Sequence, residues 1–183
     1  MKVNTTSIIG LYLAETTTVT DHRGELTRLY CERDLVSVLG ARRIVQTNYT
    51  RTCAVGAVRG MHLQYPPFAE MKFVRCLKGR VWDVAVDLRS GSATFLQWHA
   101  EELSPENARM MIVPEGFAHG FQVLEPDSEL LYLHTAAYTP AAERGFSCHD
   151  GTLAIAWPLP VVDLSSRDAS HPMIANDFPG IKP

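Results

Sequence analysis

The sequence has few cysteines, no excess of basic residues and no long hydrophobic run, and each absence excludes a class of protein. The cysteines include no C-x-x-C pair and no zinc-type spacing, so we expect free, buried thiols in a reducing compartment rather than disulfides. The formal net charge of −3 argues against broad binding to nucleic acid or to an anionic membrane surface. The four cysteines are Cys31, Cys53, Cys76 and Cys148.

The hydrophobic segments are all short. The apolar run at residues 8–14 is short for the core of a signal peptide and has no clear cleavage site after it. No segment approaches the length of a membrane span. We therefore expect a cytoplasmic protein that does not bind membranes.

The length and composition predict one globular domain. A chain of 183 residues with 46% hydrophobic and 20% charged residues can bury a sizeable core. Prolines and polar residues increase from Pro158 onward, so residues 158–183 are predicted to form an irregular tail packed on the domain.

Alternation of apolar and polar residues is the dominant pattern. In residues 80–89 the side chains of Trp82, Val84, Val86 and Leu88 fall on one face, as a half-buried antiparallel strand requires. Closely spaced strands without alternating helices predict an all-β antiparallel sandwich or small barrel. The other predicted strands are residues 8–14, 26–30, 44–50, 71–77, 95–102, 110–113, 120–124 and 130–135.

Two further local features can be predicted. Residues 32–39 are the one short helix expected in the first half of the chain. Lys78-Gly79 is a turn signal that predicts a hairpin between the strands at 71–77 and 80–89.

Several polar residues interrupt sequence that otherwise predicts buried strands. They include Arg59, His62, Lys72, His119 and Tyr132. Burying such groups together costs roughly several kcal/mol unless they are paired, so the set indicates a functional site. A base, a cation and a phenol are the groups that move protons next to a carbonyl.

Each of these residues also has a structural explanation when taken alone. A lone His62 could be a hydrogen-bonded core residue, and Lys72 could protect an edge strand from aggregation. The arginines could be surface charges. The functional interpretation is favoured because the residues occur as a set, and because His62 and Gln64, two apart in a strand, share one face.

The segment from Pro114 to His119, with the pattern Pro-x-Gly-x-x-His, resembles the second sequence motif of the cupin superfamily of β-barrels. The first cupin motif normally carries a His-x-His pair that binds metal, but His62 is followed here by Leu63 and Gln64. Because a tight transition-metal site needs three or more well-placed ligands, no metal is expected.

A longer series of motifs resembles one family, the dTDP-4-dehydrorhamnose 3,5-epimerases, from about residue 20 to about residue 170. The resemblance implies a cupin-like jelly roll, an isomerase activity and no cofactor. The motifs are Asp21-His-Arg23-Gly24, Gln46-x-Asn48, Arg59-Gly-Met-His62-x-Gln64, Lys72-x-Val74, Asp83-Val-Ala-Val-Asp-Leu-Arg89, Pro114-Glu-Gly-Phe-Ala-His119-Gly-Phe, Tyr132 and Ala156-Trp-Pro158.

The resemblance implies a role for each matching residue. His62 would be the base that abstracts a proton, Asp168 the carboxylate that orients it, and Tyr132 the proton donor on the opposite face of the sugar. Lys72 would be catalytic as well, through contact with a sugar oxygen. The residues implied in substrate binding are Arg23, Gln46, Asn48, Arg59, Lys72, His119, Tyr138, Glu143 and Arg167.

The same resemblance implies a homodimer. Its N-terminal arm of about residues 1–30, which carries Arg23, would be exchanged with the partner subunit. The substrate would be a dTDP-linked 4-keto-6-deoxy sugar, and no nucleic-acid partner is implied.

Four stretches depart from the family's usual pattern. Arg28 occupies a position where Glu is expected, and Tyr132 is followed by Leu133 and His134 instead of Lys. Glu70 and Met71 precede Lys72 where Gln and a small residue are usual, and residues 145–150 lack a Trp. These departures leave the base, the acid and the cation in place.

The leading prediction is an epimerase that inverts C3 and C5 next to a C4 ketone. The alternatives are a single-centre epimerase of another nucleotide deoxysugar, a metal-dependent cupin enzyme and a non-catalytic binder of sugar nucleotides. A metal-dependent enzyme would need a third ligand beside His62 and His119, and a binder would not need a base and an opposed acid.

Overall fold

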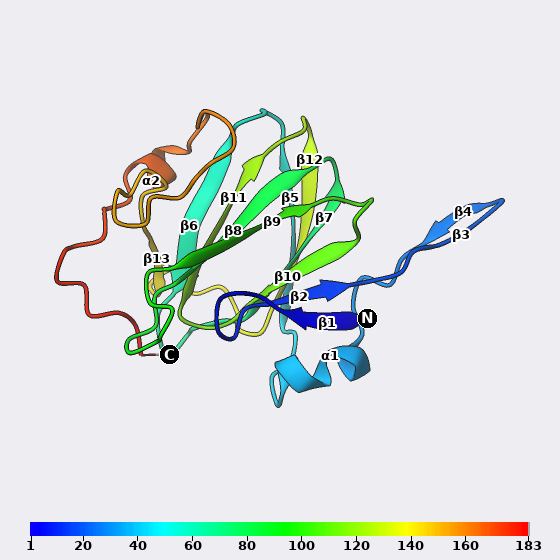
Figure 1. Ribbon diagram of the computed structural model, residues 1–183, viewed down its shortest axis with the longest axis horizontal. Helices are drawn as coiled ribbons and strands as arrows, with labels where there is room; N and C mark the ends of the chain where they lie inside the picture. The colour runs from blue at the N-terminus through cyan, green and yellow to red at the C-terminus, as the bar shows by residue number, and fades with distance from the viewer. Residues whose placement is uncertain (183) are drawn as a thin grey trace.

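The computed structural model, which describes residues 1–182, shows two antiparallel β-sheets packed face to face (Figure 1). The predicted all-β, cupin-like antiparallel fold is confirmed. The six-stranded sheet has the order β1-β2-β10-β7-β12-β5 and the five-stranded sheet the order β13-β6-β11-β8-β9. In the described residues, no helix is long and apolar enough to cross a membrane.

The elements of each sheet come from distant parts of the chain. The six-stranded sheet contains β1 (Lys2–Thr5), β2 (Tyr12–Glu15), β5 (Gln46–Thr52), β7 (Lys72–Lys78), β10 (Arg109–Val113) and β12 (Ser128–His134). The five-stranded sheet contains β6 (Val58–Gln64), β8 (Val81–Asp87), β9 (Trp98–Leu103), β11 (Phe117–Val123) and β13 (Glu143–Gly145). The remaining elements are the hairpin β3 (Val19–Asp21) and β4 (Gly24–Leu26), and the helices α1 (Glu32–Leu39) and α2 (Ser166–Ala169).

The alternation along β12 shows how one strand serves two sides of its sheet. Leu130 and Tyr132 belong to the core between the two sheets, whereas Leu133 belongs to a second core on the outer face. Because successive side chains of a strand point to opposite faces, Tyr132 and His134 point inward together. Burying apolar side chains on both faces stabilises the sheet at about 25 cal/mol per Å².

Each outer face is covered by a different segment. Helix α1, at the predicted residues, packs Leu35 and Leu39 on the outer face of the six-stranded sheet. The tail covers the five-stranded sheet with Ile174 and Ile181, which join Leu153 in one core, so the prediction of an irregular tail packed on the domain is confirmed. The tail also contains α2, which was not predicted.

The predicted hairpin at Lys78-Gly79 is wrong, because β7 and β8 lie in different sheets. The turn is present, but it carries the chain from one sheet to the other. Gly79 has a φ of +72°, and a Cβ there would lie 2.5 Å from the Ser128 Oγ. Glycine is therefore required where the crossing chain passes the start of β12.

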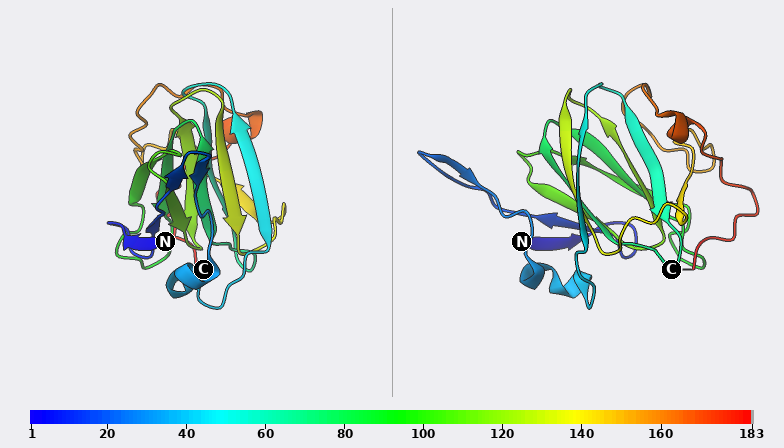
Figure 2. Two further views of the ribbon diagram at one scale, coloured as in Figure 1. Left: turned by 90° about the vertical axis from the view of Figure 1, so that its right-hand side faces the viewer. Right: turned by 180° about the vertical axis from the view of Figure 1, so that it is seen from behind.

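The N-terminal region differs from its sequence-based prediction. Residues 2–5 and 12–15 form β1 and β2 within the six-stranded sheet of the same chain, so the predicted strand at 8–14 is wrong before Tyr12, and the predicted strand at 26–30 is wrong beyond Leu26. The segment that projects from the body is the β3–β4 hairpin, seen at the right of Figure 1 and from behind in Figure 2. All six of its strand residues are exposed. Exchange of the arm with a partner stays a prediction.

The cysteines are free, and two of the four are buried as predicted. Cys76 and Cys148 are buried, whereas Cys31 is half-buried and Cys53 is exposed, which corrects the expectation for these two. Burial raises the pKa of the Cys76 thiol to about 12, so this thiol is protonated at neutral pH.

Candidate active site

A cavity of about 570 Å³ opens between the two sheets, and eleven of the predicted site residues line it. Only Arg23 lies elsewhere, on the projecting hairpin, where its guanidinium pairs with Asp21. The predicted residues around the cavity are Gln46, Asn48, Arg59, His62, Lys72, His119, Tyr132, Tyr138, Glu143, Arg167 and Asp168.

The five-stranded sheet contributes two histidines to one wall of the cavity. His62 on β6 and His119 on β11 are directly paired across the two strands. The strands approach closely beside this pair, since a Cβ on Gly60 would lie 2.6 Å from the Gly120 Cα. Glycine at both positions therefore lets the two histidines lie side by side.

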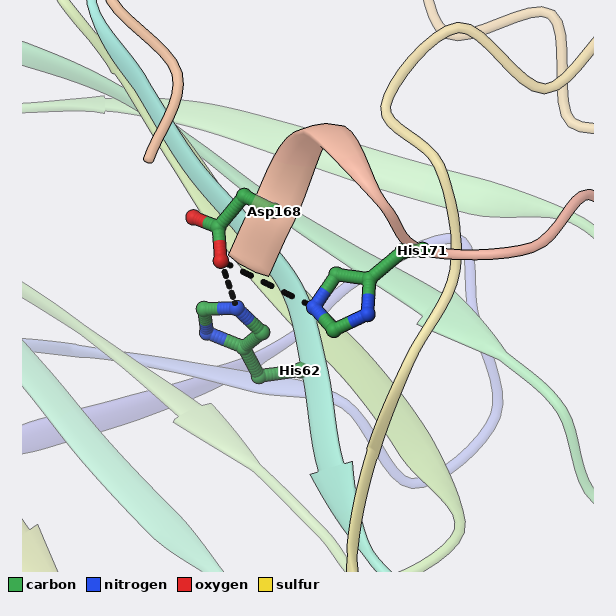
Figure 3. Close-up of side chains that lie close together, drawn as sticks. All are labelled: His62, Asp168 and His171. Carbon is green, nitrogen blue, oxygen red and sulfur yellow. Dashed lines mark hydrogen bonds and ion pairs between the residues drawn. The ribbon is translucent and has the colours of Figure 1, made fainter. Parts of the chain in front are cut away.

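His62 forms a hydrogen-bonded pair with Asp168, as Figure 3 shows. The distance from His62 Nε2 to Asp168 Oδ1 is 2.8 Å, and the second carboxylate oxygen accepts a bond from the Gly60 N–H. The Ser165 hydroxyl caps α2 by accepting from the Asp168 N–H, which fixes the position of the carboxylate. Burial works to raise the pKa of Asp168, but the bonds from His62 and Gly60 hold it well below its usual range.

His171 is a neighbour of this pair that the sequence analysis missed. Its Nε2 lies 3.6 Å from Asp168 Oδ1, and its ring meets the His62 ring edge-on at 5.4 Å (Figure 3). Burial and the neighbouring His62 lower the pKa of His171. One ligand atom from each of these three residues lies within 4.8 Å of the others, so together they could hold a metal ion.

His119 has its own carboxylate partner, which is also buried. The distance from His119 Nε2 to Asp83 Oδ1 is 2.8 Å, and both side chains are almost fully enclosed. Burial raises the pKa of Asp83 despite the opposing effect of His119. Asp83 begins one of the sequence motifs, but no role was predicted for it.

The six-stranded sheet contributes Tyr132 to the facing wall. Its side chain is deeply buried, and burial followed by the charge of Asp83 raises the pKa of the phenol well above its usual value. The phenol is therefore neutral at physiological pH and can donate a proton. Its ring lies between the rings of His119, edge-on at 6.0 Å, and His134, stacked at 5.9 Å.

Lys72 is held by two acceptors on β6 and before β7. Its Nζ donates to the backbone oxygen of His62 at 3.1 Å and lies 3.2 Å from Glu70 Oε1. An ammonium group has three N–H donors, so one remains for an oxygen atom in the cavity.

Three of the predicted substrate-binding residues, Tyr138, Glu143 and Arg167, form a connected group. Arg167 pairs with Glu143 at 2.9 Å, and the Tyr138 hydroxyl donates to the same carboxylate at 2.7 Å. Arg59 bonds to the Thr52 hydroxyl through Nε, which leaves the two terminal nitrogens of its guanidinium for a ligand.

The departures from the family pattern fall into two groups. Leu133 packs on the outer core and Arg28 pairs with Asp34 beside α1, so neither lines the cavity. Glu70 and His134 do line it, and the distance between His134 Nδ1 and Glu70 Oε2 is 3.2 Å. In the sequence, Glu70 and His134 each stand out as a departure from the family pattern, but nothing there indicates that they are in contact.

Comparisons with known proteins agree with this fold. The family model described as dTDP-4-dehydrorhamnose 3,5-epimerase matches residues 5–176. A dTDP-4-dehydrorhamnose 3,5-epimerase of Pseudomonas aeruginosa is 40% identical over 183 residues, covering 98% of this chain and 100% of the relative.

Two solved structures are also similar. The epimerase RmlC from Legionella pneumophila, in complex with dTDP-4-keto-L-rhamnose, has a TM-score of 0.89 and 38% identity over 94% of this chain and 92% of its own. ChmJ, a 3'-monoepimerase from Streptomyces bikiniensis in complex with dTDP-quinovose, has a TM-score of 0.85 and 31% identity. The match covers 92% of this chain and 85% of the ChmJ chain.

The cupin-like barrel and the matched family together define a class, that of isomerases acting on carbohydrates. Within this class the chain belongs to the dTDP-4-dehydrorhamnose 3,5-epimerase family, because the family model covers nearly the whole chain. The family predicted from the motifs is thus confirmed.

Proposed function

We propose that this protein inverts C3 and C5 of dTDP-4-keto-6-deoxyglucose, giving dTDP-4-keto-L-rhamnose. The observation that carries the proposal is the placement of an imidazole–carboxylate pair, His62 and Asp168, and a neutral phenol, Tyr132, on the two facing sheets around one cavity. Inverting a carbon centre requires removal of a proton from one face and delivery to the other, which two such groups can perform.

The hydrogen bond to Asp168 defines how His62 can act. Because a carboxylate accepts, neutral His62 carries its proton on Nε2 and keeps the lone pair on Nδ1. This lone pair removes the proton from C3 or C5, both of which flank the C4 ketone. The electrons move to O4, where the free N–H of Lys72 stabilises the enolate.

Tyr132 then completes the inversion. The phenol donates its proton to the carbon from the face opposite His62, and the C–H bond that forms replaces the one that broke. If the protonated His62 instead exchanges its captured proton with solvent and returns a solvent proton to the same face, the centre keeps its configuration but exchanges its hydrogen. Exchange and inversion are therefore separable events on the same enolate.

The remaining polar residues of the cavity are proposed to bind the nucleotide part. Arg59 and Arg167 supply guanidinium groups for the diphosphate, which they can bind through paired N–H donors. The other proposed contacts are Gln46, Asn48, His119, Tyr138 and Glu143.

The test is NMR of dTDP-4-keto-6-deoxyglucose incubated with the protein in deuterium oxide, with exchange followed at C3 and C5 separately. Deuterium at both centres, with formation of the L-rhamno product, is the expected result. Exchange at one centre alone would establish a single-centre epimerase, as the similar protein ChmJ, a 3'-monoepimerase, is. Binding without exchange at either centre would support the non-catalytic alternative.

A metal-dependent reaction is the second candidate, favoured by the cluster of His62, Asp168 and His171. A metal ion bound there would occupy nitrogen and oxygen atoms that, in the proton-transfer proposal, form the hydrogen bond between His62 and Asp168. Dialysis against EDTA, followed by the deuterium-exchange assay, distinguishes the two. The proton-transfer proposal expects an unchanged rate, and loss of exchange that zinc restores would overturn it.

We also propose that the protein is a cytoplasmic homodimer in which the β3–β4 hairpin contacts the partner. The support is the exposure of apolar side chains on the projecting hairpin, 63% for Val19 and 74% for Leu26. Isolated two-stranded hairpins are marginally stable in water, so a partner surface would stabilise it. Sedimentation of the protein with and without residues 19–26 tests the proposal, which expects a dimer only when the hairpin is present.

A further inference from the structure

Glu70 and His134 lie together in the cavity wall beside Tyr132, although 64 residues separate them in the chain. His134 follows Tyr132 by two positions on β12, so both point into the cavity, and it pairs with Lys72 of β7 in the sheet register. The planes of the His134 and Tyr132 rings differ by only 11°. The Glu70 and His134 side chains are 8% and 9% exposed, so both are enclosed by protein.

The hydrogen bonds around His134 have a definite direction. The backbone N–H of Tyr138 can only donate, and it donates to Gln46 Oε1 at 2.8 Å. Gln46 therefore presents its Nε2 to Asn48 Oδ1, and Asn48 in turn presents its Nδ2 to His134 Nε2 at 3.4 Å. His134 Nε2 is thus an acceptor, and the ring proton lies on Nδ1, facing Glu70.

Glu70 accepts hydrogen bonds from three sides. Its donors are His134 Nδ1 at 3.2 Å, Gln64 Nε2 at 3.1 Å and Lys72 Nζ at 3.2 Å. The amide of Gln64 is oriented by the Thr139 N–H, which donates to its oxygen. Although burial opposes ionisation, the bond from His134 and the charge of Lys72 bring the pKa of Glu70 below its usual value. Glu70 is therefore a carboxylate at neutral pH.

We propose that Glu70 and His134 are positioning residues for the reprotonation step. Glu70 holds the His134 ring by its Nδ1–H, and the ring, bound at both nitrogens, holds the plane of the Tyr132 phenol stacked on it. The inference rests on the proposed function, because it assigns the pair to the proton transfer by Tyr132.

Proton delivery is sensitive to small displacements of its donor, Tyr132. Proton removal depends instead on His62, which lies on the facing sheet. A displacement of about 1 Å can cost about a hundredfold in rate. Loosening the pair should therefore slow delivery from Tyr132 more than removal by His62. The consequence to measure is the ratio of inversion to hydrogen exchange at the same carbon.

The chain offers a matched control for both residues. His99 lies 3.3 Å from Glu101, and Glu101 also binds a cation, Arg109, at 2.9 Å. Neither His99 nor Glu101 lines the cavity. The variants H99F and E101Q therefore disrupt a similar His–Glu–cation group outside the cavity. We expect them to leave the reaction unchanged.

The experiment measures inversion and deuterium exchange at C3 and C5 for H134F, E70Q and the double variant. Phe keeps an aromatic ring against Tyr132, and Gln keeps the shape of Glu, so each variant removes hydrogen bonding or charge with little change in volume. Each single variant should lower inversion about tenfold or more with exchange reduced by less than about threefold. The double variant should be no worse than the more affected single variant, because the two residues act as a unit.

Other outcomes overturn the inference. Equal losses of exchange and inversion in H134F and E70Q would indicate a structural role, and rates as little changed as those expected for H99F and E101Q would indicate no role in the reaction. The variant Y132F separates the two proposals. If Y132F lowers inversion but keeps exchange while H134F and E70Q do not, only the positioning inference fails. If Y132F leaves inversion intact, the assignment of Tyr132 as the acid fails and the inference fails with it.

Discussion

The two walls of the cavity are built in different ways. His62 lies on a strand of the five-stranded sheet, but its partner Asp168 comes from the tail, 106 residues away, and the His62 side chain is 20% exposed. Tyr132 lies on a wall made of β7, β12 and β5, three adjacent strands of one sheet, and is enclosed by protein.

The difference fits the chemistry proposed for each wall. A base that must lose its captured proton to solvent in every cycle benefits from partial exposure, and a carboxylate at its other nitrogen stabilises the imidazolium. An acid that must stay neutral until it acts benefits from burial, which raises the pKa of Tyr132. One cavity thus provides two environments for two halves of a reaction.

Removing the base should have the largest effect, because without proton removal by His62 there is no enolate for Tyr132 to protonate. We expect His62→Ala to lower both exchange and inversion at least about a thousandfold, since general-base catalysis contributes about 10²–10⁴. NMR in deuterium oxide measures both rates. His99→Ala is the control and should retain full activity. Exchange within about tenfold of the wild-type rate in His62→Ala would show that another group is the base.

Removing the acid should leave proton removal by His62 intact and so show the contribution of the wall that carries Tyr132. We expect Tyr132→Phe to lower inversion about a hundredfold while exchange by His62 falls by less than about threefold. The same NMR experiment gives both values. Normal inversion in this variant would move the role of acid to another group, and Tyr138, which also lines the cavity, would be examined first.

Neutralising Asp168, the carboxylate that the tail supplies, tests how much the tail contributes to the action of His62. We expect Asp168→Asn to lower kcat about thirtyfold with little change in KM, because the imidazolium loses the anion that stabilises it. Since the pKa of Asp168 lies below its usual range, the group is ionised throughout the assay. The loss should therefore be about the same at every pH from about 5 to 9. A loss confined to one end of this range would contradict the assignment.

The smallest expected effect is on stability and concerns Glu70, on the side of the cavity that carries Tyr132. The pKa of Glu70 is lower in the folded protein than in the unfolded chain, so its charge stabilises the fold above its unfolded pKa of about 4.3. This contribution is lost as the pH falls through the folded value. Glu70→Gln should lower the free energy of unfolding by about 2 kcal/mol at pH 7.

Urea denaturation at several pH values measures this difference. The difference between wild type and Glu70→Gln should shrink as the pH falls below about 4, because the wild-type carboxylate then becomes protonated. Glu101→Gln is the control at a more accessible His–Glu pair. A difference that stays constant in acid would show that the ionised form of Glu70 contributes nothing to stability.

Much of the fold could be predicted from local sequence because the signals are local. Alternating residues such as Val84 and Val86 predicted their strand, and residues 32–39 formed the predicted helix. The assignment of strands to sheets could not be predicted in this way. Lys78-Gly79 has the residues of a hairpin turn, but whether two consecutive strands pair depends on which other strands compete for their edges.

The sequence by itself determined the family, the strand-rich architecture and the residues expected to act, since motifs around His62, Lys72, His119 and Tyr132 can be read from adjacent positions. The resemblance already implied Asp168 as the partner of His62, but only the tertiary structure decided the carboxylate partners of the other two histidines, Asp83 for His119 and Glu70 for His134. The physical reason is distance along the chain. These contacts join residues 36 to 106 positions apart, and hydrogen bonds between side chains form only where packing of the sheets and tail brings them within about 3 Å.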